Sequence, residues 1–236
     1  MDISVIIPTL NEAENIAETI LHAKNNLSKE YAVEFILIDA GSGDDTVIFG
    51  KEHVDRIVVD PTLKGAKYKS LNKGAELARG KVLFFLDADC KVPLHFDVAI
   101  LNFLKSQEII GGAFEFKMMN DHFIYKIIEL INRIRYRITK NYFGDQGLFC
   151  NKSKYIEVGG FSNEPIMEAA YLCRKLRKVG KIGLIRKHLR SSVRRFEDGG
   201  VVQVFLKDTI IWIQFLLRLD IKRYAADYWA KNENKD

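Results

Sequence analysis

The chain has 236 residues, of which 47% are hydrophobic and 28% charged, enough for the core of one α/β domain, or of one domain plus a helical appendage, but too few for two independent domains. The net charge of +5 is uneven, since residues 1–116 carry 12 Lys and Arg against 18 Asp and Glu, while residues 117–236 carry 24 against 13. The basic half is suited to binding nucleic acid, anionic lipid or a phosphorylated substrate, or it is a plain solvated face. The three cysteines are odd in number and lack metal-ligand spacing, which argues against a disulfide framework.

The first hundred residues alternate short β-branched runs with helical patterns, which is typical of βαβ units and a mainly parallel sheet. The predicted strands, nearly continuous in apolar residues as expected where helices cover both faces, lie at residues 3–7, 35–38, 56–59 and 82–86. One helix is expected to open at an Asn cap, Asn11, with Glu14 three positions later. Another covers residues 66–78 and stops at Gly80, whose freedom to adopt positive φ suits a helix C-terminus.

Polar loops follow three of these strands. In open α/β sheets the ligand lies outside the carboxyl ends of the strands, which here lead into residues 8–9, 39–43 and 87–89. We therefore expect their polar side chains to converge on one edge of the sheet. In the Asp-x-Asp segment, Asp87 and Asp89, one carboxylate can face ligand hydroxyls while the other reaches a hard cation such as Mg²⁺ or Mn²⁺. Alone, this segment equally fits a solvated turn.

After residue 93 the pattern becomes mainly helical. A helix near 94–105 and a strand at 113–116 precede a long amphipathic helix from about 122 to 141. Its apolar stripe is Ile124, Ile127, Ile128, Ile131, Ile134 and Ile138, and the same segment carries Arg133, Arg135, Arg137 and Lys140. Further helices are expected at about 153–158, 167–179 and 201–219. Because no repeat or linker interrupts the chain, we expect a single domain over residues 1–236 whose role changes near residue 111.

The last predicted helix is apolar nearly all round, so it must be covered by the core, by a second copy in a homodimer or by a membrane surface. Its apolar run at 209–217 is far shorter than the about 20 residues that cross a bilayer, so only peripheral membrane contact is expected. The N-terminal residues show no basic region or cleavage site of a secretory signal. We therefore expect a cytoplasmic protein, with a place at the inner face of the membrane left open.

Several segments together resemble glycosyltransferase family 2, and they agree with it in order and spacing. They are residues 4–12 (SVIIPTLNE), 35–46 (FILIDAGSGDDT), 67–75 (KYKSLNKGA) and 79–89 (RGKVLFFLDAD). Gly-Gly-Phe at 159–161, followed by Glu168, extends the resemblance over nearly the whole chain. Gly-Asp-Gln-Gly at 144–147 and Arg-Arg-Phe-Glu at 194–197 are similar to elements of small bacterial-type members.

The resemblance implies the A-type glycosyltransferase fold, a Rossmann-like α/β arrangement with a mainly parallel central sheet and C-terminal helices. It implies that residues 1–110 bind a nucleotide sugar and residues 111–236 bind the acceptor. The implied activity is inverting, hexosyltransferase-like transfer from a UDP- or GDP-sugar, in which Mg²⁺ or Mn²⁺ assists departure of the nucleoside diphosphate.

The resemblance also implies roles for single residues. Asp89 is the direct metal ligand, and Asp87 faces the ribose or the metal. The other implied donor-binding residues are Pro8, Thr9 and Glu12 at the base and ribose, Asp39 at the base, and Lys67 near the diphosphate. The plain alternatives are a turn cap for Asp39 and a solvated helix face for Lys67.

Two adjacent arginines, Arg194 and Arg195, form a second donor-binding candidate. The planar guanidinium matches phosphate oxygens, so one of them would close over the diphosphate, and the glycines at 199 and 200 would permit that motion. The alternative is a salt bridge with Glu197 or Asp198.

The general base departs from the family pattern. Inverting transfer to a hydroxyl needs a group that takes the acceptor's proton, and the Asp expected for this is replaced by Ala169. Glu168, one residue earlier, is the favoured substitute, and Asp145 is the second candidate. A phosphate acceptor, such as a polyprenyl phosphate, is already ionised and would need no base. The acceptor thus stays open between a lipid phosphate and a saccharide.

Other functions fit less well. A non-catalytic nucleotide-sugar binder that lost its base at Ala169 remains an alternative. A nucleotidyltransferase would carry a Gly-rich basic loop after the first strand, where this chain has residues 8–12. A dehydrogenase would show Gly-x-Gly-x-x-Gly there, and a nucleic-acid partner is not expected because aromatic residues are not interleaved with the basic ones.

Overall fold

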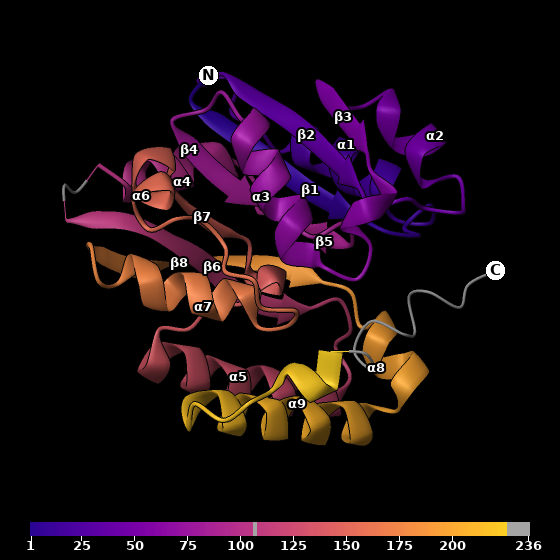
Figure 1. Ribbon diagram of the computed structural model, residues 1–236, viewed down its shortest axis with the longest axis vertical. Coiled ribbons are helices and arrows are strands. Elements are labelled where there is room, and N and C mark those ends of the chain that lie inside the picture. Colours follow the sequence, from indigo (N-terminus) through magenta and orange to yellow (C-terminus); the bar gives the residue numbers. More distant parts are fainter. Residues whose placement is uncertain (106–107, 226–236) are drawn as a thin grey trace.

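The computed structural model describes residues 1–105 and 108–225. Within these residues eight strands form one mixed sheet, in the order β3-β2-β1-β4-β7-β6-β8-β5, with helices on both faces (Figure 1). The strands are β1 Ile3–Thr9, β2 Val33–Asp39, β3 Arg56–Val59, β4 Val82–Phe85, β5 Cys90–Lys91, β6 Ile109–Met118, β7 Leu148–Asn151 and β8 Lys181–Ser191. The helices are α1 Ile16–Asn25, α2 Thr46–Lys51, α3 Lys67–Leu77, α4 Phe96–Phe103, α5 Phe123–Thr139, α6 Lys152–Glu157, α7 Glu168–Leu176, α8 Arg194–Gly199 and α9 Val201–Leu216, with 3₁₀ turns η1 Pro61–Leu63, η2 Gly144–Gln146 and η3 Lys222–Tyr224.

The first four predicted strands are all present, and β3, β2, β1 and β4 pair in parallel. Successive side chains of a strand point to opposite faces of the sheet, so β1 divides its apolar residues between two cores. Val5 packs in one core with Ile20 of α1, and Ile6 packs in the other with Leu71 of α3. This double coverage explains the continuous apolar runs, and it leaves the carboxyl ends of β1, β2 and β4 at one edge.

The second half of the sheet is mixed, because β7 pairs antiparallel with both β4 and β6 while β8 runs parallel to β6. Neither β7 nor β8 is predicted from the sequence. β7 has only four residues, which are too few to show the alternating apolar pattern of a strand. In β8, exposed Arg186, Lys187 and His188 interrupt the apolar pattern beside a register shift between Phe114 and Glu115 of β6.

The helix cap predicted at Asn11 is wrong, since α1 begins at Ile16 and its N-cap residue is Asn15. Asn11 has a φ of 54°, and its backbone N–H donates to the Ser42 hydroxyl at 2.9 Å. Its side-chain oxygen accepts from the Gly43 N–H, also at 2.9 Å. The residue that resembles a helix cap instead ties the loop after β1 to the loop after β2.

Gly80 is glycine for a reason other than the expected positive φ, which it does not adopt. A Cβ at this position would lie 2.5 Å from the Ser4 backbone nitrogen and 2.7 Å from the Ile3 carbonyl carbon. The Gly80 N–H also donates to the Ser4 hydroxyl at 2.8 Å. The chain after α3 therefore passes so close to β1 that no side chain fits.

Gly80→Ala is accordingly expected to lower the free energy of unfolding by about 1–3 kcal/mol, because the new methyl group meets backbone atoms rather than a movable side chain. Gly43→Ala is the matched control, since a Cβ at Gly43 has no heavy atom within 4 Å. Urea unfolding measures both variants. Equal stability of the two would contradict the close approach.

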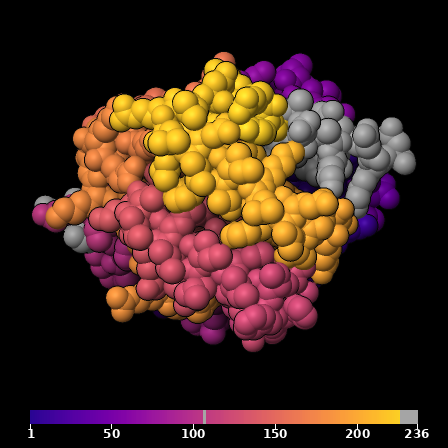
Figure 2. All heavy atoms as spheres, turned by 90° about the horizontal axis from the view of Figure 1, so that it is seen from below, coloured from indigo at the N-terminus to yellow at the C-terminus, as the bar shows by residue number. Residues whose placement is uncertain are grey.

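The two longest helices, α5 and α9, cover the molecule on one side, as Figure 2 shows from below. The predicted isoleucine stripe of α5 is divided, because Ile128 is buried whereas Ile134 and Ile138 are exposed. In α9, Ile211 and Phe215 are buried, so the core covers only part of its apolar surface. Within residues 1–105 and 108–225, no helix is both long enough and apolar enough to cross a membrane.

Candidate active site

Asp39 and Thr9 lie opposite each other at the carboxyl ends of β2 and β1. The buried Asp39 carboxylate accepts hydrogen bonds from the hydroxyls of Thr9 and Ser42, at 3.0 and 2.5 Å. It also accepts from the backbone N–H groups of Gly41 and Ser42, at 3.0 and 2.8 Å. Asp39 therefore caps the Gly-Ser turn, and its contacts hold the loops after β1 and β2 together.

Glu12 connects the loop after β1 to the C-terminal half of the chain. Its backbone N–H donates to the Thr46 hydroxyl at 2.7 Å. Its carboxylate accepts from Arg194, with Nη2 at 2.8 and 2.9 Å from the two oxygens. Arg195 instead pairs with Asp208 of α9. Of the two predicted arginines, Arg194 therefore contacts the loop after β1, whereas Arg195 pairs with a residue of α9. Pro8 lies half-buried within β1.

Asp87 and Asp89 follow β4 and meet Lys67, the first residue of α3. Lys67 Nζ donates to Asp87 Oδ1 at 2.7 Å, and its side chain is only 20% exposed, so the solvated-face alternative is wrong. Burial, and after it the negative charges of Asp87 and Glu12, raises the pKa of Asp89 to about 6. Lys67 and Arg194 act in the opposite direction. Negative charge is therefore concentrated at Asp89 and only partly neutralised.

The η2 turn, which holds the Gly-Asp-Gln-Gly element, lies directly against this ion pair. A Cβ on Gly144 would be 2.8 Å from Asp87 Oδ2 and 3.1 Å from Lys67 Nζ. The next residue, Asp145, has its pKa raised to about 6 by burial, while the charge of Arg135 on α5 opposes that shift. The negative charge of Asp87 contributes to the rise. Asp145 thus belongs to the same electrostatic cluster as the Asp-x-Asp segment.

Glu168 is the first residue of α7 and is also buried beside this cluster. Burial raises the pKa of its carboxyl group, the positive charge of Lys67 lowers it, and Asp87 raises it. Ala169, at the position where an Asp was expected, packs into the core with Leu172 of the same helix. The structure therefore places Glu168, and not residue 169, toward the charged site.

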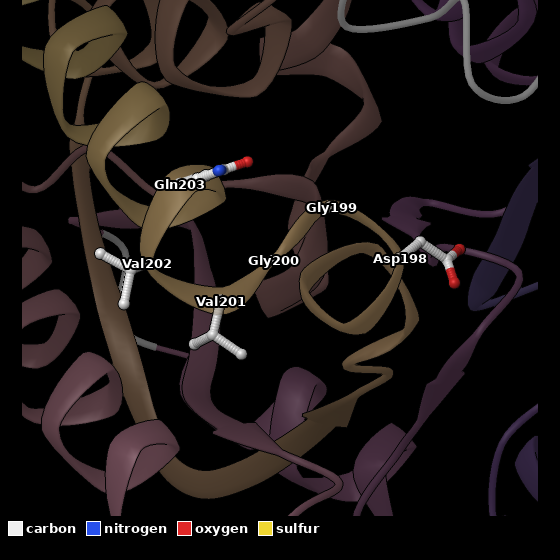
Figure 3. Close-up of a pocket in the computed structure, with 6 residues that line it drawn as sticks. All are labelled: Asp198, Gly199, Gly200, Val201, Val202 and Gln203. Carbon is white, nitrogen blue, oxygen red and sulfur yellow. The ribbon is translucent and has the colours of Figure 1, made fainter.

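An open hollow lies at the turn from α8 to α9, lined by residues 198–203 (Figure 3). Gly200 turns the chain there with a φ of 77°. None of its lining residues belongs to the carboxylate cluster. The hollow is therefore separate from the candidate active site.

A family model, Glycosyl transferase family 2, matches residues 4–160. The chain belongs to this family. It is similar to the glycosyltransferase AglE of Haloferax volcanii, with 32% identity over an alignment of 93 residues that covers 37% of this chain and 30% of that protein. It is also similar to a PGL/p-HBAD biosynthesis glycosyltransferase of Mycobacterium tuberculosis, with 32% identity over 92 residues, 36% of this chain and 34% of that protein. The chain thus spans about a third of the length of these curated relatives.

Solved structures share the fold of this family 2 chain. A mannosyltransferase from Pyrobaculum calidifontis, in complex with GDP-Man and Mn²⁺, has a TM-score of 0.65 and 18% identity, and the match covers 81% of this chain and 56% of that one. Glucosyl-3-phosphoglycerate synthase from Mycobacterium tuberculosis, with Mn²⁺ and UDP, has a TM-score of 0.65, 17% identity and coverage of 93% and 81%. The predicted family resemblance and the A-type glycosyltransferase fold are confirmed.

The charged cluster of this glycosyl transferase family 2 chain offers a divalent cation only part of its ligands. Among the described residues, no three His, Cys, Asp or Glu side chains gather as a ready ligand set. Asp87 and Asp89 supply hard carboxylate oxygens, and the pKa of Asp89 is raised first by burial and then by the negative charges of Asp87 and Glu12. Such a partial set suits a cation that takes its other ligands from substrate phosphates and water.

Two residues important for the site were not predicted. Asn72 on α3 donates from Nδ2 to the Phe161 carbonyl at 3.0 Å and accepts from the Phe161 N–H at 3.0 Å and the Tyr155 hydroxyl at 2.5 Å. It thereby anchors the segment that leads to α7. The second is Arg135, whose charge opposes the pKa rise of Asp145. Asn72 stands inside the family segment 67–75, which could have indicated it, whereas Arg135 was noted only among the basic residues of its helix, and nothing local indicates its place near Asp145.

Two partly buried carboxyl groups with raised pKa values predict an unusual dependence of stability on pH. The folded pKa values of Asp89 and Asp145 are about 6, above the ordinary value of 3.8, so between these values the folded state binds more protons than the unfolded state. The free energy of unfolding should therefore rise as the pH falls from 7.5 to 5. Below about pH 4.5 the gain should reverse, because Glu34 and Glu115 have lowered pKa values.

Urea unfolding in the presence of EDTA at pH 7.5, 6 and 5 measures this dependence. In the double variant Asp89→Asn/Asp145→Asn, the rise toward pH 5 should be smaller than in the wild type, since neither position can then take up a proton, and what remains should come from Glu168 and Asp208, whose pKa values burial also raises. A wild-type stability that falls steadily from pH 7.5 to 5 would contradict the pKa directions.

Proposed function

We propose that the chain transfers a sugar from a UDP- or GDP-sugar to an acceptor, with inversion at the anomeric carbon. The observation that carries this proposal is the meeting of Asp89, Asp87 and Lys67 at the carboxyl edge of the parallel strands, in a chain of glycosyl transferase family 2. The cluster offers carboxylates for a cation and an ammonium group for phosphate side by side. A sugar diphosphate with its metal requires both.

The choice of donor rests on the solved structures that share the fold. One binds GDP-Man and Mn²⁺, another binds UDP and Mn²⁺, and a Staphylococcus aureus protein, TarS, binds UDP-GlcNAc. In this chain the loops after β1 and β2, tied together by Asp39, would hold the base and ribose between Pro8, Thr9 and Glu12. The donor stays open between uridine and guanosine diphosphate sugars.

The residues of the cluster would act on the leaving group. Asp89, with Asp87, would hold Mg²⁺ or Mn²⁺, which when bound supplies positive charge to the departing diphosphate. Lys67 would add a charge-assisted hydrogen bond to the same phosphates. Arg194 contacts Glu12 in this structure, and donor phosphates would compete for its guanidinium. These contacts strengthen as the bond from C1 to the phosphate oxygen breaks and negative charge develops.

The acceptor oxygen attacks C1 from the opposite side and must lose its proton. We assign this proton to Glu168, with Asp145 as the second candidate. Burial raises the pKa of both carboxyl groups, which moves each toward the range in which a base works best near neutral pH. An ionised phosphate acceptor would bypass both.

The proposed enzyme is one domain, with a donor half at residues 1–110 and an acceptor half at 111–236. The pairing of β7 with β4 supports this, because the sheet continues from one half into the other.

The test is turnover of the purified protein with UDP- and GDP-sugars in the presence of Mn²⁺, followed as release of the nucleoside diphosphate. We expect release with one donor class, its loss on addition of EDTA, and the opposite anomeric configuration in the product. The rival function, a binder without catalysis, predicts binding but no release. Robust metal-independent release would contradict the assignment of Asp87 and Asp89.

A further inference from the structure

The outward side of α5 is apolar along its whole length. Six large apolar side chains recur there every three or four residues and are 37–75% exposed: Phe123, Ile127, Leu130, Ile131, Ile134 and Ile138. The opposite side of the helix is packed through Tyr125, Ile128 and Tyr136, which are buried. A helix on a protein surface normally turns its polar side to water. Here the side left uncovered by the fold is the apolar one.

The outward side of α9 shows the same inversion. Its exposed apolar residues, 37–65% accessible, are Val202, Leu206, Ile210, Ile213, Leu216 and, just past the helix, Leu217. The buried residues Ile211 and Phe215 lie on the other side, in a cluster with Ile166, just before α7, and Ala170 of α7. The spacing again places every exposed apolar residue within one arc of the helix. No charged residue of the helix falls inside that arc.

These two sides form one continuous surface, which we call the outer face. α5 and α9 lie next to each other both in the ribbon view (Figure 1) and in the view from below (Figure 2). The Arg135 guanidinium of α5 is 6.0 Å from the ring of Trp212 on α9, which joins the helices along their common edge. Contiguous apolar areas of this kind mark interaction sites on soluble proteins.

The borders of the outer face are strongly basic. Segments 122–140 and 201–225 together hold nine Lys and Arg against three Asp and Glu. Six of the nine are exposed: Lys126 and Arg137 of α5, Lys140 at its end, and Arg218, Lys222 and Arg223 after α9. Of these, Arg137 also pairs with Glu115 of β6. An apolar surface with a cationic border complements a bilayer of anionic lipids, in which the apolar part enters the headgroup boundary while the cations meet lipid phosphates.

We propose that the outer face docks onto the surface of an anionic lipid bilayer. A second copy of the chain fits less well, because a two-fold contact would set identical patches against each other and bring the cationic borders together. Docking through α5 and α9 places the predicted acceptor half, rather than the donor loops, next to the lipid. The inference does not depend on the proposed transfer reaction, since lipid binding and turnover are measured separately.

The experiment is flotation of the full chain with vesicles of phosphatidylcholine alone and of phosphatidylcholine mixed with an equal amount of phosphatidylglycerol. We expect the protein to float with the mixed vesicles and more weakly with the neutral ones. Ile134→Glu/Ile213→Glu, with one substitution on each helix, should lower the partition coefficient by at least about tenfold. Lys126→Gln should lower it about fivefold on the mixed vesicles alone.

Leu94→Glu/Ile156→Glu is the matched control, because these side chains are 56% and 64% exposed and lie outside both helices. It should float like the wild type. Thermal unfolding checks that every variant is folded. Failure of the folded wild type to float with either vesicle would overturn the proposal. So would a wild-type dimer in sedimentation that the α5/α9 substitutions dissociate, because a second copy would then occupy the outer face.

Discussion

Asp89→Asn is expected to abolish the Mn²⁺-dependent binding of a sugar nucleotide and, at the same time, to stabilise the unliganded protein. Both effects follow from one cause. The Asp89 carboxylate is largely removed from water and lies near the negative charges of Asp87 and Glu12, which together raise its pKa to about 6. The ionised carboxylate therefore lowers the free energy of unfolding by about 1–3 kcal/mol, since one pKa unit corresponds to about 1.36 kcal/mol. A bound cation would offset the cost, and an amide would remove it.

Thermal unfolding at pH 7.5 measures both effects. A donor at about 100 times its Kd stabilises a protein by about 2.7 kcal/mol, which raises the Tm of a chain of this size by about 5–10 °C. We expect this rise in the wild type with Mn²⁺ and its loss in Asp89→Asn, whose Tm without ligand should be higher than that of the wild type.

The matched control for this prediction is Asp121→Asn, an exposed carboxylate paired at 3.7 Å with Lys117, which should change neither quantity. A Mn²⁺-dependent rise that survives in Asp89→Asn would refute the assignment of Asp89 as metal ligand. A lower Tm of unliganded Asp89→Asn would show instead that the carboxylate makes a stabilising contact.

The donor-binding side of the site could be predicted from the sequence, because the order of the strands along the chain determines which loops meet at the edge of the sheet. Strands covered on both faces are continuous apolar runs, and parallel strands bring their carboxyl ends to one edge. Thr9, Asp39 and Asp87 each end or follow such a run, so their approach to one edge required no knowledge of the other half of the chain. The charge of Lys67 could be assigned to this edge only through the family resemblance.

The contacts between distant segments could not be predicted in the same way. Glu12 and Arg194 are 182 positions apart, and nothing in either local sequence indicates their ion pair. The amphipathic pattern of α5 has a related limit. Periodicity shows that a helix has an apolar side, but Tyr125 and Tyr136 on the opposite side are also suited to burial. Packing against β6 decides between the two sides, and it selects the one with the aromatic residues.

Glu168→Gln is expected to lower kcat about 10²–10⁴-fold with donor binding unchanged, if the acceptor is a hydroxyl. The substitution keeps the size and polarity of the side chain but removes its capacity to accept a proton. It should not destabilise the fold, since burial raises the pKa of Glu168 and so disfavours its charged form. Glu157→Gln on α6, at an exposed carboxylate, is the control and should retain full activity.

Asp145→Asn separates the two candidate bases. If Asp145 were the base, its substitution would cause the larger loss, and the wild-type rate would fall below about pH 6 as that carboxyl takes up a proton. We expect the smaller loss at Asp145, because the positive charge of Arg135 on α5 opposes the rise of its pKa. Full activity of both variants would point to an ionised acceptor phosphate, which attacks without surrendering a proton. Single-turnover rates measured with saturating donor decide among the three outcomes, because donor binding then no longer contributes to the difference.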